Sequence, residues 1–236
     1  MRSLISFFTR IPAKGDVYRA SQSLYLITVV AIIIALFPLI LYIIIYRFIP
    51  RILLTIILLL SIYGVTGLLH LDGLADFSDG IMKKGTRDEK IRVLKDVNTG
   101  IGGTFSVIMI LLIEFYAIYS LRINLIGVAA FFIVSEISAK LSMLTGLIIF
   151  KAPEQGLANE FKKSARGSYL IIAILLTIPL IIIFKITYFN IFAGIVISLI
   201  IGSLSNKNFG FVNGDALGAM NEISRAATMW LLCLGL

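Results

Sequence analysis

Long apolar runs, separated by short polar segments, most constrain the fold of this chain. An α-helix needs about 20 mostly apolar residues to cross the hydrocarbon core of a bilayer. The runs that approach this length are 21–46, 52–69, 104–120, 125–150, 168–184, 190–204 and, with the polar residues that precede the last one, 216–236. Only 14% of the 236 residues are charged, against about a quarter in soluble domains. The sequence predicts an all-α bundle of six or seven transmembrane helices, one integral membrane domain over 1–236.

The basic residues fall mainly on one side of these predicted spans. Sixteen of the 21 Lys and Arg residues lie in the N-terminal segment 1–20 and in three polar segments, 70–103, 151–167 and 205–225. The turns on the opposite side contain Arg47, Arg51, Arg122 and Lys185. Because cytoplasmic loops carry an excess of Lys and Arg, the N-terminus and the three polar segments are predicted to be cytoplasmic. The net charge of +8 therefore reflects topology, and nucleic-acid binding is not expected.

The acidic residues are even more one-sided. Eleven of the 13 Asp and Glu residues lie on the predicted cytoplasmic side, and the other two, Glu114 and Glu136, are in predicted spans. Glu136 precedes Lys140 by four residues, which favours an ion pair. Glu114 has no partner near it in sequence, so it is expected in the bundle interior or beside a cavity. This distribution predicts a multi-pass protein of the cell membrane whose active site faces the cytoplasm, with the oligomeric state left open.

One short segment concentrates three carboxylates. Asp72, Asp76 and Asp79 have the spacing i, i+4, i+7, which places them within an arc of roughly 60° if the segment is helical. Like charges on one helix face repel each other, and a divalent cation with a preference for oxygen ligands would compensate. The sequence therefore predicts a metal site here. The alternative is a solvated acidic turn, because Gly73 and Gly80 also suit turns.

Basic residues and glycines follow these acids. Six residues of the segment 83–95 are Lys or Arg, and Gly100 and Gly103 come soon after. Carboxylates that hold a metal, cations that neutralise phosphate and glycines that permit close approach suit a metal-bridged diphosphate. Arg92 and Lys95 are candidate phosphate ligands on this interpretation. The alternative for the cations of this loop is contact with lipid headgroups.

A second acidic constellation lies near the C-terminus. Asp215 and Glu222 are spaced i, i+7, so both face one way on a helix. Asp215 follows Gly214 at an expected helix start, where capping is the alternative role for its carboxylate. Glu222 lies two turns into a helix that enters the membrane, where an unpaired carboxylate is costly. A partner for Glu222 is expected, namely Arg225, a metal or a substrate.

These motifs together resemble the cobalamin synthase (adenosylcobinamide-GDP ribazoletransferase) family. The matching segments are His70–Asp76 with Asp79-Gly80, Lys95-Asp96 with Gly100 and Gly103, Gly156-Leu157, Gly214–Ala219 with Glu222, and Phe8–Pro12. They occur in the family's order and cover nearly the whole chain. The chain departs from the family pattern at Val97, where serine is usual, at Glu114, where lysine is expected, and at Lys140, where arginine is expected.

The resemblance implies a Mg²⁺-dependent transfer that completes the nucleotide loop of cobalamin. The ribose hydroxyl of α-ribazole, or of its 5′-phosphate, attacks the cobinamide-side phosphorus of adenosylcobinamide-GDP and expels GMP. Asp72, Asp76 and Asp79 would hold Mg²⁺, with Mn²⁺ as a substitute. Either Asp96 or Asp215 would complete the metal shell or accept the hydroxyl proton. The predicted substrate contacts are His70, Arg92, Lys95, Gly100, Gly103, Gly214 and Glu222.

Three other functions are weaker alternatives. Membrane phosphotransferases that form phospholipids continue their motif Asp-Gly-x-x-Ala-Arg, and no Ala-Arg follows Gly73. Membrane prenyltransferases use two Asp-rich loops, whereas this chain has one. A cation transporter would place its acids near the midplane inside broken helices. The cytoplasmic position of 11 of the 13 acids counts against transport.

Overall fold

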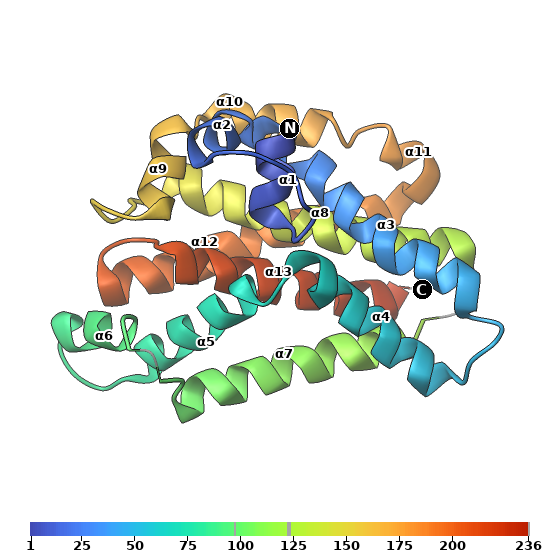
Figure 1. The fold of residues 1–236 in the computed structure, drawn as a ribbon, viewed down its shortest axis with the longest axis horizontal. Helices are drawn as coiled ribbons and strands as arrows, with labels where there is room; N and C mark the ends of the chain where they lie inside the picture. The colour runs from blue at the N-terminus through green and yellow to red at the C-terminus, as the bar shows by residue number, and fades with distance from the viewer. Residues whose placement is uncertain (97, 122–123, 236) are drawn as a thin grey trace.

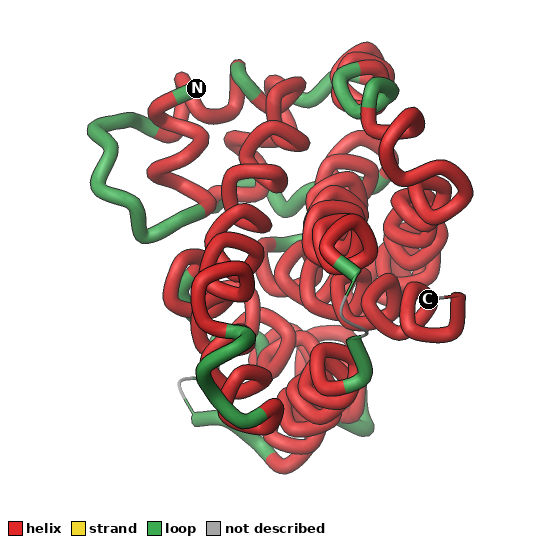
Figure 2. Tube along the Cα trace, turned by 90° about the vertical axis from the view of Figure 1, so that its right-hand side faces the viewer, coloured by secondary structure: helices red, strands yellow, loops and turns green. Residues whose placement is uncertain are grey.

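The protein is a bundle of helices, with no strand among the residues that the structure describes (Figures 1 and 2). The computed structural model describes residues 1–96, 98–121 and 124–235. Val97 and Arg122, which the sequence patterns singled out, lie outside these described residues. An all-helical fold suits a membrane because each helix satisfies its own backbone hydrogen bonds without water.

The described helices vary widely in length. In chain order they are α1 Arg2–Phe8, α2 Val17–Gln22, η1 Leu24–Leu26, α3 Ile27–Ile45, α4 Arg51–Thr66, α5 Leu69–Met82, α6 Arg87–Val93, α7 Ile101–Tyr119, α8 Leu125–Ile149, α9 Leu157–Ser164, α10 Gly167–Leu175, α11 Leu180–Phe184, η2 Lys185–Phe192, α12 Ala193–Phe209 and α13 Gly214–Gly235.

Fewer helices qualify as membrane spans than the sequence predicts. Four segments are long and apolar enough to cross a membrane, namely Leu24–Ile45, Ile101–Tyr119, Leu125–Ile149 and Leu180–Phe209. Helices α4 and α5 qualify only as a pair, bent by 90°. Gly67 lies at this bend with a φ of 74°, a conformation that favours glycine. The described chain therefore has four candidate spans, or five with the bent pair, in place of six or seven.

Two predicted spans account for most of this difference. The expected span 168–184 is interrupted because α10 ends at Leu175 and a turn runs from 176 to 179. Pro179 ends this turn, and proline lacks the N–H that would continue the helix. The predicted last helix exists as α13, but its polar residues keep it out of the set of apolar spans.

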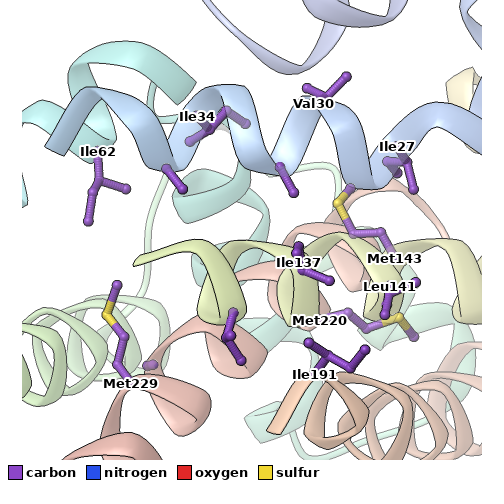
Figure 3. Close-up of a cluster of buried hydrophobic side chains, with 14 of the residues drawn as sticks. Ile27, Val30, Ile34, Ile62, Ile137, Leu141, Met143, Ile191, Met220 and Met229 are labelled. Atoms are coloured by element: carbon purple, nitrogen blue, oxygen red, sulfur yellow. The ribbon is translucent and has the colours of Figure 1, made fainter. Parts of the chain in front are cut away.

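Helices α8 and α13 form the centre of the bundle. Helix α13 packs against α8, α5, α12 and α7, and lies between them in Figure 1. Figure 3 shows Ile137 and Leu141 of α8 beside Met220 of α13 and Ile191 of η2 in one buried cluster. Because α13 is central, its acidic residues meet partners from several other helices.

Candidate active site

Helix α5 carries the three predicted acids and crosses α13 in direct backbone contact. A Cβ atom on Gly73 would lie 3.0 Å from the Asp215 Cα, and one on Gly218 would lie 2.8 Å from the His70 carbonyl oxygen. The close approach that glycine permits here is therefore to the backbone of another helix. This crossing places the first turn of α13 beside Asp72 and Asp76.

Asp215 does not cap α13, because a neighbouring residue does so. The Asn213 Oδ1 accepts from the backbone N–H of Ala216 at 3.0 Å, which is the contact of an N-cap residue. The Asn213 Nδ2 donates to the Asp215 Oδ2 at 2.6 Å. The capping role considered for Asp215 is therefore wrong. Burial raises the pKa of Asp215, the Asn213 hydrogen bond lowers it, and the charge of Asp72 raises it again.

Asp79 is bound to the start of α7. Its Oδ2 accepts from the Gly100 N–H at 2.6 Å, and its Oδ1 accepts from the Gly103 N–H at 2.8 Å. A Cβ on Gly100 would lie 2.5 Å from the same carboxylate, so these glycines allow α7 to begin against α5. The free N–H groups and positive end of a helix stabilise a carboxylate in this position. The structure thus gives Asp79, Gly100 and Gly103 a structural role, and their metal and substrate contacts stay predictions.

The remaining donors suit a hard divalent cation. Asp72, Asp76 and Asp215 offer carboxylate oxygens around one helix crossing, and Asp76 lies within electrostatic reach of the other two. In the described residues no group of three or more His, Cys, Asp or Glu side chains is already arranged as a metal site. Mg²⁺ needs fewer protein ligands than such a group provides, because it commonly keeps several waters and binds one or two carboxylates plus substrate phosphates.

Two cavities meet the N-terminal end of α13. The aromatic pocket has a volume of about 200 Å³ and is lined by Phe7, Phe8, Leu69, His70, Asp72, Met143, Leu147, Leu157, Ala158, Phe161, Gly214, Asp215 and Leu217. The lysine groove is larger, about 790 Å³, and is lined by Ile91, Leu94, Lys95, Lys151, Ala152, Pro153, Glu154, Gln155, Gly156, Gly210, Phe211 and Asn213. Asn213, which lines the groove, is hydrogen-bonded to Asp215, which lines the pocket, so the two cavities are adjacent at this point.

The other predicted site residues lie at different places. His70 and Gly214 line the aromatic pocket, and Lys95 lines the lysine groove. Arg92 is exposed on α6. Asp96 is exposed, and its Oδ1 accepts from the Asn98 side chain at 3.0 Å. No hydrogen bond in the described part of the chain joins Asp96 to the acids of α5.

Glu222 belongs to a buried ion cluster inside the bundle. Its Oε1 accepts from Asn221 at 2.9 Å, and its Oε2 is bonded to Arg225, the first partner expected from sequence. The Arg225 Nε lies 2.8 Å from the Glu114 Oε1, and the Tyr63 hydroxyl donates to the other Glu114 oxygen at 2.8 Å. Glu222 is 1% exposed, and its contact with substrate stays a prediction.

The predicted pair of Glu136 and Lys140 adjoins this cluster. The Lys140 Nζ lies 3.8 Å from the Glu136 Oε2, which confirms the ion pair, and donates to the Asn221 Oδ1 at 2.6 Å. The prediction of Glu114 in the interior is also confirmed, because its side chain is fully buried. Tyr63 and Asn221 are parts of the cluster that sequence reasoning missed, and neither has a local pattern that would have identified it.

Comparison with known proteins agrees with the motifs. Residues 1–233 match the family described as Cobalamin-5-phosphate synthase. A Pyrococcus abyssi protein named adenosylcobinamide-GDP ribazoletransferase is 41% identical, with all of this chain and 98% of the relative covered. Proteins of the same name from Thermococcus kodakarensis and Archaeoglobus fulgidus are 38% and 30% identical, each covering 99% of this chain and 98% and 96% of their own lengths. No solved structure matches this chain. The chain belongs to the cobalamin-5-phosphate synthase family.

Proposed function

We propose that this protein joins adenosylcobinamide-GDP to α-ribazole, or to its 5′-phosphate, in the last step of cobalamin nucleotide-loop assembly. The family match over 1–233 and relatives named for this reaction support the proposal. The observation that carries it structurally is the crossing of α5 and α13, which holds Asp215 beside Asp72 at the junction of two unequal cavities. A reaction between one large and one small substrate suits such an arrangement.

The transfer forms one P–O bond and breaks another. The ribose hydroxyl oxygen attacks the cobinamide-side phosphorus, the diphosphate P–O bond breaks, and GMP leaves with the bonding electrons. Asp72, Asp76 and Asp215 would hold Mg²⁺, which when bound neutralises charge on the diphosphate and on the departing GMP. The predicted alternatives for the proton acceptor are Asp96 and Asp215. A carboxylate that holds Mg²⁺ is a weaker base, so Asp215 would accept this proton only if it does not bind the metal.

The lysine groove supplies positive charge beside this crossing. Lys95 and Lys151 both line it, and cations there would neutralise phosphate oxygens that the carboxylates repel. We also infer that this end of the bundle faces the cytoplasm of the cell, because the surplus of Lys and Arg lies in the segments that form it. The substrates are phosphorylated and polar, so they would reach the site from water.

The direct test is GMP release by the purified protein in detergent. The protein receives adenosylcobinamide-GDP and Mg²⁺, with and without α-ribazole 5′-phosphate. Release that needs the nucleotide and the metal supports the proposal, and absence of release by folded protein contradicts it. Asp72→Asn and Asp76→Asn should each abolish turnover while the protein still inserts. Asp88→Asn is the matched control, because Asp88 is an exposed acid of α6.

A further inference from the structure

The aromatic pocket and the lysine groove differ in both size and chemistry. The pocket holds about 200 Å³ and the groove about 790 Å³. Phenylalanines line one end of the pocket, where the ring centroids of Phe7 and Phe161 are 4.5 Å apart. Two lysines line the groove. Two substrates that differ in size, polarity and charge would therefore each bind in a different cavity.

The volume of the pocket limits its occupant to a small flat group. An apolar cavity of about 150 Å³ binds benzene, whereas sites for drug-sized ligands reach about 300–1,000 Å³. A cavity of about 200 Å³ therefore suits one or two fused aromatic rings and excludes a corrin macrocycle. Aromatic walls favour a flat ring, which stacks on them or meets them edge to face.

His70 adds a polar contact to this apolar pocket. Its side chain lines the pocket and is 7% exposed, and its ring centroid lies 6.2 Å from that of Phe8. The His70 Nδ1 is buried and has no hydrogen-bond partner among the described residues. A buried polar atom without a partner is costly, so a ligand with a nitrogen or hydroxyl group would satisfy it.

We propose that the aromatic pocket binds the benzimidazole-type base of the ribazole substrate, with His70 as its polar contact. This inference rests on the proposed function. The base fills the apolar part of the pocket, and the attached ribose extends toward Asp72 and Asp215, which line the same cavity. The bulkier, negatively charged adenosylcobinamide-GDP occupies the lysine groove. The size of the pocket thus determines which base the ribazole substrate, and therefore the cobalamin product, can carry.

The outer wall of the pocket is formed by short helices, which makes it open to substitution. Helix α9 contributes Leu157, Ala158 and Phe161 to the lining. A hydrogen bond of 2.8 Å between the Ser21 and Ser164 hydroxyls attaches α9 to α2. Because α9 is not one of the candidate spans, substitutions on it change the pocket without altering a membrane-crossing helix.

The test places the same substitution in each cavity. Ala158→Leu reduces the volume of the aromatic pocket, and Ala152→Leu reduces that of the lysine groove. One methylene in an apolar substrate pocket changes discrimination by about 10- to 200-fold. We therefore expect Ala158→Leu to raise the KM for α-ribazole 5′-phosphate about tenfold or more, with little change in the KM for adenosylcobinamide-GDP. Ala152→Leu should leave the KM for the ribazole unchanged.

A second variant covers the case in which Ala158→Leu does not fold. Phe161→Ala enlarges the pocket, so it should accept ribazole analogues whose base carries an additional fused ring, which the native protein rejects. An unchanged ribazole KM in folded Ala158→Leu, or unaltered base selectivity in Phe161→Ala, would overturn the proposal. These same two results are expected if the pocket naturally holds a lipid chain. Absence of product from the native protein would instead overturn the proposed function itself.

Discussion

Gly73 of α5 lies against the backbone of Asp215 in α13, so two helices that carry the candidate acids touch without an intervening side chain. A Cβ atom on Gly73 would lie 3.0 Å from the Asp215 Cα and 3.5 Å from the Gly218 Cα. A methyl group at position 73 would press on this backbone, so α13 would have to yield by a few tenths of an ångström. The distance between the acids of the two helices therefore depends on a glycine at position 73.

Gly73→Ala should impair catalysis through this spacing. Overpacking of a tight contact costs about 1–3 kcal/mol, and a loss of about 1.4 kcal/mol from transition-state binding is tenfold in rate. We expect kcat/KM for GMP release to fall about tenfold or more. The matched control is Gly64→Ala in α4, where an added Cβ has no atom within 4 Å. Native activity in Gly73→Ala would contradict the role assigned to the crossing.

Substitution of Asp79 should lower the stability of the fold and have little effect on metal binding. Loss of a side-chain acceptor at a helix N-terminus costs about 0.5–2 kcal/mol, so Asp79→Ala should lower the thermal unfolding temperature in detergent. Asp79→Asn retains one acceptor and should lose less stability. The Mg²⁺ concentration needed for half-maximal GMP release should stay near the native value in Asp79→Asn. A large rise in this Mg²⁺ concentration would show that Asp79 binds the metal.

Local patterns in the sequence predicted the parts of the site that depend on one helix. The spacing of Asp72, Asp76 and Asp79 placed them on one face if the segment is helical, and the structure shows that it is, as α5. The pair of Glu136 and Lys140 was predicted for the same reason, since both residues lie one turn apart on α8. Such contacts have a fixed periodicity, so residue type and spacing suffice to identify them.

Contacts between distant segments could not be predicted in this way. Asp79 accepts hydrogen bonds from residues 21 and 24 positions further along the chain, and Arg225 binds Glu114 across 111 positions. No local pattern specifies such partners. The interrupted span 168–184 was missed because apolar residues continue through the turn, and Pro179 was the one signal against a continuous helix.

Arg225 should be essential for folding because it forms ion pairs with three buried acids, Glu114, Glu136 and Glu222. Its guanidinium is bonded to Glu114 and Glu222, and all three side chains are at most 1% exposed. Removal of one partner from a buried ion pair costs about 3–5 kcal/mol, so Arg225→Met should strongly reduce the yield and thermal stability of folded protein. The double variant Arg225→Met/Glu114→Gln should recover part of this loss. Arg166→Met, at an exposed arginine, is the control.

Protonation of Asp215 should compete with Mg²⁺ binding. Burial raises the pKa of Asp215, the Asn213 hydrogen bond lowers it, and the charge of Asp72 raises it again, with a net shift above the ordinary aspartate value. A raised pKa keeps the carboxyl protonated at a higher pH, and metal ligands must be deprotonated. The apparent affinity for Mg²⁺ should therefore fall as the pH decreases from neutral to mildly acidic, and recover as it rises.

Mn²⁺ binding, followed by electron paramagnetic resonance over a pH series, measures this competition without turnover. Asp215→Asn should bind Mn²⁺ more weakly and lose the component of the pH dependence that belongs to Asp215. Asn213→Asp would add charge, so Asn213→Ala is the better second variant: it removes the hydrogen bond that lowers the pKa and should shift the loss of affinity to higher pH. Asp88→Asn should retain the native profile. If Asp215→Asn keeps the native affinity and the native pH dependence, Asp215 does not belong to the metal site.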